Sequence, residues 1–168
     1  MKLYIKQRVF SWSDKFAVKD ETETDRWFAQ GEIFSLTQRL HVFDANNVEQ
    51  ATIHRKLVSL LPRYYIETGG AEYEFAGQLA FFKQKYTIEQ LGWTIEGNFM
   101  AHDYTIDSGM GAIMSMKKAW FTWGDSYELD IADPKNELMC LCAALAIDCV
   151  HSSSKGSGLA GLGTFANN

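Results

Sequence analysis

The sequence feature that most constrains the fold is a nearly uninterrupted apolar stretch, Leu138–Val150, close to the C-terminus. Only Asp148 in it is charged, and the preceding Asp133 and Pro134 favour the first turn of a helix. A helix that is apolar on all sides has to be covered on all sides. Its 13 residues are too few to span a bilayer, which needs about 20. We therefore expect a helix enclosed by protein, with a marginal membrane anchor as the alternative.

The rest of the chain repeats a short pattern six times: a bulky apolar residue, any residue, and then Val, Ile or Leu. Such alternation is typical of a strand with one buried face. An apolar run and a short polar break precede each copy, so each unit predicts a β-hairpin and the chain about twelve strands. The copies begin at Phe16, Leu40, Tyr64, Tyr86, Tyr104 and Tyr127. The preceding runs are Val9–Trp12, Ile33–Leu36, Leu57–Leu61, Leu79–Phe82, Trp93–Met100 and Trp120–Trp123.

The predicted strands and helix fit together as a single all-β domain over residues 1–151. A barrel of about twelve strands is wider than side chains can fill, since about eight strands make the filled size. We therefore expect a twelve-stranded closed antiparallel β-barrel around a buried C-terminal hydrophobic α-helix. A β-sandwich with a packed helix is the alternative, and it would leave one side of the helix exposed. Residues 152–168 are rich in Ser and Gly, which predicts a flexible tail.

Charge and cysteine content exclude several classes of function. Lys and Arg number 16 and Asp and Glu 21, a net charge of −5 that argues against a nucleic-acid binder. The three cysteines cannot all pair within one chain, so we expect a reducing, cytoplasmic location. The four histidines lack the spacing of a helical zinc site, and the sequence has no Gly-x-Ser-x-Gly motif. We expect no catalytic residue, no metal site and no cofactor, and hence no enzyme.

Basic residues give the one indication of binding. In four successive hairpins a basic residue directly precedes the strand pattern: Lys15, Arg39, Arg63 and Lys85. If these positions share one end of the barrel, they form a ring of positive charge that Arg55–Lys56, Lys83 and Lys117–Lys118 would extend. Such a ring would hold phosphate groups by charge-assisted hydrogen bonds.

Two functional hypotheses follow from these residues. The first is a non-enzymatic module that binds phospholipid head groups or other anions, peripheral at the inner membrane face and without a transmembrane segment. The second is a soluble scaffold or sensor that binds a protein partner or a small apolar ligand. Ordinary solvated strand ends without any ligand are the simplest alternative to the first.

Asp148 is the most informative charge, because an enclosed carboxyl group must find hydrogen-bond donors or change its pKa. We expect it near the barrel end in a structural role, bonded to the backbone or to a Lys or Arg. A ligand or proton site is the alternative. Structural roles are also expected for Trp93 and Trp123.

Several short motifs, distributed over residues 1–150, together resemble one family. They are Met1–Gln7, Val9–Ser11, Asp14–Phe16, Leu61–Tyr64, Gly92–Thr94, Ala101–Tyr104, Trp120–Asp125, Tyr127–Leu129 and Ala146–Asp148. With them the chain resembles bacterial members of the LURP-one-related (LOR) family, a branch of the Tubby-like C-terminal domain superfamily. The resemblance implies a twelve-stranded barrel around a C-terminal helix, as in Tubby and the phospholipid scramblases. Tubby binds phosphoinositides at membranes, but its ligand-binding motifs have no match in this sequence.

Overall fold

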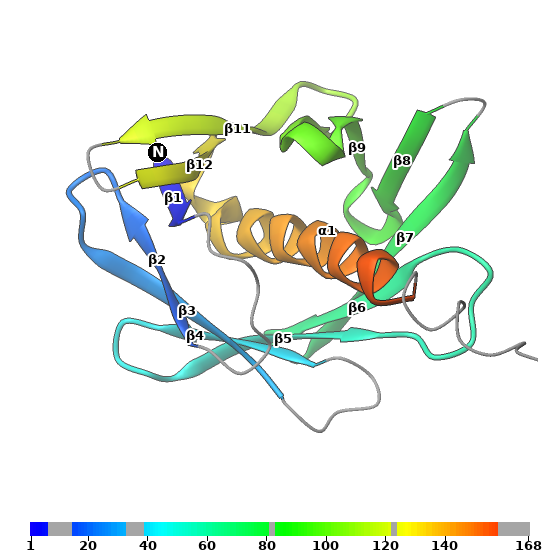
Figure 1. Ribbon diagram of the computed structural model, residues 1–168, viewed down its shortest axis with the longest axis horizontal. Coiled ribbons are helices and arrows are strands. Elements are labelled where there is room, and N and C mark those ends of the chain that lie inside the picture. Colours follow the sequence, from blue (N-terminus) through cyan, green and yellow to red (C-terminus); the bar gives the residue numbers. More distant parts are fainter. Residues whose placement is uncertain (7–14, 33–38, 81–82, 122–123, 158–168) are drawn as a thin grey trace, which may run out of the picture.

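Twelve strands close into one antiparallel barrel in the computed structural model, which describes residues 1–6, 15–32, 39–80, 83–121 and 124–157. Each strand pairs with the next, and β1 pairs with β12 to close the ring. Helix α1 (Glu137–Ser157) runs through the middle of this ring (Figure 1). The strands are β1 (Lys2–Lys6), β2 (Phe16–Asp20), β3 (Asp25–Gly31), β4 (Leu40–Asp44), β5 (Glu49–Arg55), β6 (Arg63–Thr68), β7 (Ala71–Ala80), β8 (Lys83–Ile88), β9 (Trp93–Asn98), β10 (Asp103–Asp107), β11 (Ala112–Phe121) and β12 (Gly124–Ile131). The expected fold class is confirmed.

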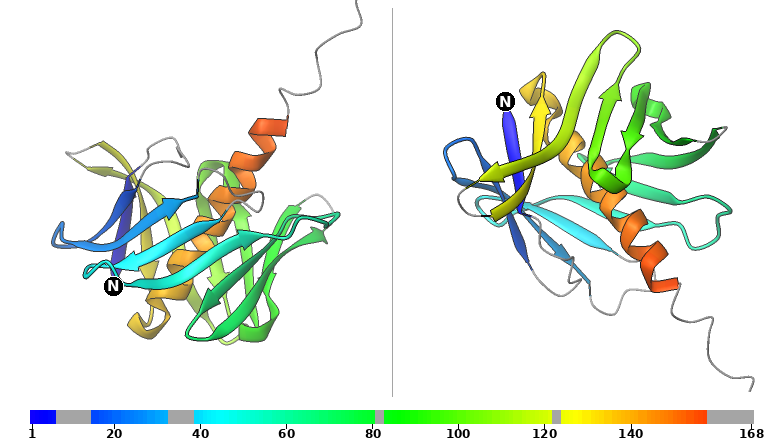
Figure 2. Two further views of the ribbon diagram at one scale, coloured as in Figure 1. Left: turned by 90° about the horizontal axis from the view of Figure 1, so that it is seen from below. Right: turned by 45° about the horizontal axis from the view of Figure 1, so that its top comes forward.

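Helix α1 is enclosed by the strands, as its composition predicts. Leu141, Ala144 and Leu145, of which a β-sandwich would leave some exposed, are all 0% exposed. They join the inward-facing side chains of the strands in one continuous apolar core. Figure 2 shows the strands surrounding the helix from two further directions. Full burial of each leucine contributes about 2 kcal/mol, so the helix supplies much of the barrel's stability.

The first turn of α1 is tied to the barrel wall by polar contacts. Asp133 caps the short 3-10 helix η3 (Pro134–Asn136), which leads into α1, and its side chain accepts a hydrogen bond from the Lys135 backbone. Glu137 is buried, and its carboxylate accepts hydrogen bonds from the Arg26 guanidinium and from Trp27 Nε1 at 2.8 Å. A carboxylate in the first turn also suits the positive end of the helix dipole. These contacts fix where the helix enters the barrel.

The second strand of each predicted hairpin is confirmed: the six repeats lie in β2, β4, β6, β8, β10 and β12. One predicted first strand is wrong. Leu57–Leu61 forms the exposed connection between β5 and β6, and β5 precedes it at Glu49–Arg55. Tyr64 already pairs with Arg55, so the residues between them have no strand to pair with. Val9–Trp12 and Ile33–Leu36 fall outside the described residues.

The remaining structural predictions concern the chain end and two tryptophans. Helix α1 continues through residues 152–157, where the sequence predicts a flexible tail, while residues 158–168 lie outside the described part. The domain boundary at 151 stays a prediction. Trp93 opens β9 and is buried in the core. Trp123 lies outside the described residues. No helix in the described residues is long and apolar enough to cross a membrane.

Candidate functional site

The two ends of the barrel carry opposite charge. At one end, here called the acidic end, the described turns between strands are rich in carboxylates, as in Asp20–Asp25 and Asp44–Glu49. At the other, here called the basic end, the even-numbered strands begin, and Lys or Arg stands at or just before four of their starts. Helix α1 enters at the acidic end and reaches the basic end with its C-terminal turns (Figure 1). A protein of net negative charge thus has a basic face of its own.

The four predicted cations stand at or near the starts of strands at the basic end, but three of their side chains lie against neighbours on the wall, and the Lys15 ammonium reaches Asn47 in the Asp44–Glu49 turn of the acidic end. Lys15 donates a hydrogen bond to Asn47 and lies over the Phe28 and Phe43 rings. Arg63 pairs with Glu74, and Lys85 pairs with Glu96 at 2.9 Å. Arg39 is exposed and forms no ion pair with a described residue. The roles of these four residues stay a prediction.

A surface loop whose sequence predicts a strand lies exposed at the basic end. It is the β5–β6 loop (residues 56–62). Val58 is 89% exposed and Leu60 104%, and Leu57 is exposed as well. Isolated exposed apolar residues are ordinary, but three within four positions form a protruding patch. Met100, also exposed, lies at the same barrel end in the 3-10 helix η2 (Phe99–Ala101).

Basic residues flank the β5–β6 loop on both sides. Arg55 and Lys56 precede the three apolar residues, and Arg63 follows them. Arg55 is exposed and has no ion pair with a described residue, whereas Lys56 lies over the Tyr65 ring, with Nζ 5.5 Å from its centre. The loop therefore joins an apolar tip to a cationic base.

Main-chain hydrogen bonds hold the β5–β6 loop in shape. The Lys56 N–H donates to the Arg63 carbonyl at 2.9 Å and closes the base of the loop. The Gly77 N–H donates to the Pro62 carbonyl at 2.8 Å and ties the loop to β7. Within the loop, the Ser59 hydroxyl donates to the Leu61 carbonyl. The apolar tip is thus presented on an ordered base, which lowers the entropy cost of docking it.

Asp148 lies in the part of α1 that approaches the basic end, and a histidine lies beside its carboxyl group. Asp148 Oδ1 is 3.4 Å from His102 Nδ1, and the His102 ring stacks on Tyr127 with 4.0 Å between centres. Burial raises the pKa of Asp148 to about 7. Burial, and then the nearby Asp148 carboxyl, hold the pKa of Tyr104 well above its usual value. This buried polar cluster sits below the basic surface.

Comparison with known proteins identifies the family. The model of the LURP-one-related family matches residues 1–148. The chain is similar to the uncharacterized protein YxjI of Bacillus subtilis, at 36% identity over 151 residues, which covers 89% of this chain and 93% of the relative. No solved structure matches. The family match spans nearly the whole barrel and its helix, and the chain therefore belongs to the LURP-one-related family.

Proposed function

We propose that this protein is a non-enzymatic module that docks its basic end onto an anionic phospholipid surface at the inner face of the membrane. The observation that carries the proposal is the β5–β6 loop, in which Leu57, Val58 and Leu60 protrude between Arg55–Lys56 and Arg63. Apolar tips that enter the lipid interface and cations that meet phosphate groups are the two contributions that peripheral membrane binding requires.

The loop can supply binding free energy both from its apolar side chains and from its basic side chains. A leucine moved fully from water to an apolar phase contributes about 2 kcal/mol, and partial insertion of Leu57, Val58 and Leu60 a fraction of that each. Each basic residue held near an anionic surface adds about 1 kcal/mol. Arg39 and Arg55 are exposed without a described ion-pair partner, so they can make this contribution without breaking an existing pair. The sum supports reversible binding to a membrane.

Charge also favours one orientation of the barrel. Carboxylates crowd the turns of the acidic end, and an anionic surface repels them. The basic end is attracted over about one Debye length, about 8 Å at physiological salt. The barrel would therefore approach the membrane with its β5–β6 loop first. The β5–β6 loop, with its apolar tip and exposed Arg55, therefore supports head-group binding better than the ring of four cations does, because three of those cations already contact neighbouring side chains.

Vesicle flotation tests this function. The full chain is mixed with phosphatidylcholine vesicles that contain or lack phosphatidylserine, at low and high salt. We expect binding to the anionic vesicles only, weakening as salt rises. Binding that ignores lipid charge, or no binding to either vesicle, would contradict the proposal. A protein partner that captures the loop in the absence of lipid would instead favour the scaffold function.

Matched variants locate the docking surface. Leu60→Ser removes one apolar tip residue, and Arg55→Glu reverses one flanking charge; each should weaken binding several-fold. Met110→Ser makes a comparable change at an exposed methionine, 96% exposed, between β10 and β11 at the acidic end. It should bind as the unaltered chain does. Equal loss in all three variants would place the contact elsewhere.

A further inference from the structure

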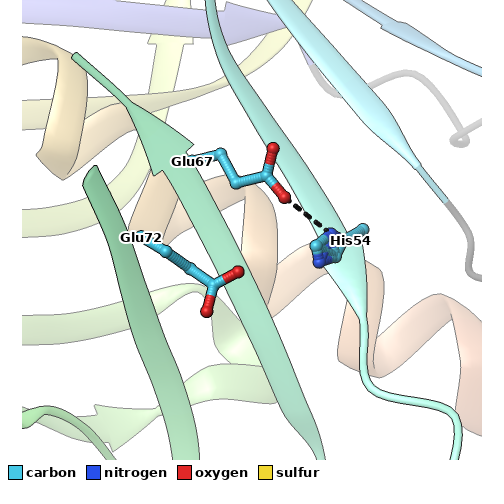
Figure 3. Close-up of side chains that lie close together, drawn as sticks. All are labelled: His54, Glu67 and Glu72. Atoms are coloured by element: carbon cyan, nitrogen blue, oxygen red, sulfur yellow. Dashed lines mark ion pairs between the residues drawn. The ribbon is translucent and has the colours of Figure 1, made fainter. Parts of the chain in front are cut away.

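A second cluster, on the outer wall of the barrel beside the base of the β5–β6 loop, brings one histidine and two glutamates together. His54 comes from β5, Glu67 from β6 and Glu72 from β7 (Figure 3). One ligand atom from each lies within 4.8 Å of the others. Glu67 and Glu72 also line a shallow groove between these strands. Three consecutive strands thus present a nitrogen and two carboxylates to one point.

The strand register fixes this arrangement. Glu67 is directly opposite Glu72 across the β6–β7 hairpin. On the other side of β6, Glu67 pairs with Thr52, which places His54 two positions along β5 on the same outward face. The His54 ring is held against the Tyr65 ring, with 5.4 Å between centres. The three side chains therefore meet without any change of the backbone.

The cluster brings two carboxylates and one imidazole into close approach. Carboxylates directly opposite each other in adjacent strands repel, which destabilises the pair. His54 Nδ1 lies 3.5 Å from Glu67 Oε1, yet it forms no hydrogen bond with a described residue and is shielded from solvent. Glu72 has no hydrogen-bond or ion-pair partner in the described part of the chain. A cation between the three side chains would balance both carboxylates.

His41 on the neighbouring strand β4 shows the contrasting case. Its Nδ1 lies 3.0 Å from Glu49 and its Nε2 3.1 Å from Glu32, so each ring nitrogen already has a carboxylate partner. Glu49 also accepts a hydrogen bond from Thr52 at 2.6 Å. That histidine has no nitrogen left for a metal ion. In the His54 cluster, by contrast, Nδ1 has no hydrogen-bond partner among the described residues.

We propose that His54, Glu67 and Glu72 bind a divalent transition-metal ion, of which Zn²⁺ is the representative. One imidazole nitrogen and two carboxylate oxygens are a donor set that zinc and its neighbours accept, whereas Mg²⁺ and Ca²⁺ prefer oxygen alone. Ligand atoms around one zinc ion lie about 3.4 Å apart. The exposed Glu67 and Glu72 side chains close the remaining distance by rotation, and water completes the coordination.

Calorimetric titration of the untagged full chain with Zn²⁺ tests this site. We expect one Zn²⁺ per chain with a dissociation constant in the micromolar range, unchanged by millimolar Mg²⁺. His54→Gln and Glu72→Gln each remove one ligand and should weaken binding at least tenfold. Glu72 is exposed, so its variant should keep the far-UV circular dichroism of the unaltered chain. His41→Gln is the matched control and should leave the affinity unchanged.

Cobalt provides a second readout that does not depend on affinity. Co²⁺ bound through imidazole and carboxylate should give visible absorption bands that His54→Gln abolishes and His41→Gln retains. No saturable Zn²⁺ binding, equal binding by the His54→Gln and Glu72→Gln variants, or displacement by millimolar Mg²⁺ would each overturn the site. The vesicle experiments remain separate from these outcomes, because they measure the contributions of Leu60 and Arg55, neither of which is a ligand in the cluster.

Discussion

Replacing Asp148 by asparagine should stabilise the barrel and remove a slope from its stability against pH. Asp148 is 6% exposed, and burial raises its pKa from 3.8 to about 7. Between these two values the folded state holds a proton that the unfolded chain has released. Stability therefore falls as pH rises through this window, and the loss is complete above pH 7. Asparagine keeps the shape of the side chain and carries no charge at any of these pH values.

The size of the effect follows from the difference between the two pKa values. A difference of about 3 units at about 1.4 kcal/mol each gives up to about 4 kcal/mol above pH 7. His102, 3.4 Å away, lowers this figure to the extent that it is protonated and attracts the carboxylate. We expect Asp148→Asn to gain about 2–4 kcal/mol at pH 8 and little at pH 4.

Urea unfolding followed by circular dichroism at several pH values between 4 and 8 measures this directly. Asp103→Asn, the same chemical change at an exposed strand residue near His102, is the control and should change the pH profile little. A variant that is less stable than the unaltered chain at pH 8 would contradict this prediction. It would mean that the Asp148 carboxylate is net favourable, through its contact with His102 or the backbone.

Three further predictions concern stability and reactivity. Glu137→Ala should lose about 2–3 kcal/mol in urea unfolding, because the Arg26 and Trp27 donors lose a charged acceptor; unchanged stability would show that these contacts contribute nothing net. Gly97→Ala should lower the thermal midpoint by several degrees or prevent folding, since a Cβ at this position of φ 148° would lie 2.4 Å from the Asp103 carbonyl oxygen; a fully stable variant would contradict this geometry. The native protein should react with a thiol reagent only after unfolding, because burial raises the pKa of each helix thiol, to about 12 for Cys140; fast labelling without denaturant would show that the helix is accessible.

The strands and the helix could be predicted because both rest on patterns local to the sequence. The repeats that begin at Tyr64 and Tyr104 alternate with period two, and their inward residues are buried in β6 and β10. The Leu138–Val150 stretch is apolar on every side, which only an enclosing structure satisfies. Twelve strands then fix a barrel wide enough to hold the helix. The fold therefore followed from residue type and spacing.

The β5–β6 loop escaped prediction because apolar runs normally indicate burial. Leu57–Leu61 has the composition of a strand, but Pro62 cannot donate to a ladder and the β5–β6 register leaves these residues unpaired. Their exposure shows only once the pairing is known. The stability of the fold does not require an apolar patch on the surface. Sequence patterns that predict burial therefore cannot predict such a patch.

The His54 cluster was missed because its members come from three strands. A local signal was nevertheless present in the stretch from Glu67 to Glu72. Gly69 and Gly70 have φ values of 58° and 77°, as a two-residue hairpin turn requires, and such a turn places Glu67 opposite Glu72. His54 joins them only through the pairing of β5 with β6, which the sequence does not specify. A hairpin turn thus predicts which two residues lie opposite each other in its strands. A site built from three strands can be predicted only when the register between all three strands is known.

Fluorescent labels at the two ends of the barrel test whether the protein docks onto membranes through its basic end. An environment-sensitive fluorophore is attached to Leu60→Cys in the β5–β6 loop or to Met110→Cys at the acidic end; the native thiols are buried and stay unlabelled. With phosphatidylserine-containing vesicles we predict a blue shift and brighter emission at position 60 and no change at position 110. No change at position 60, or the same change at both positions, would show that the protein does not dock through its basic end.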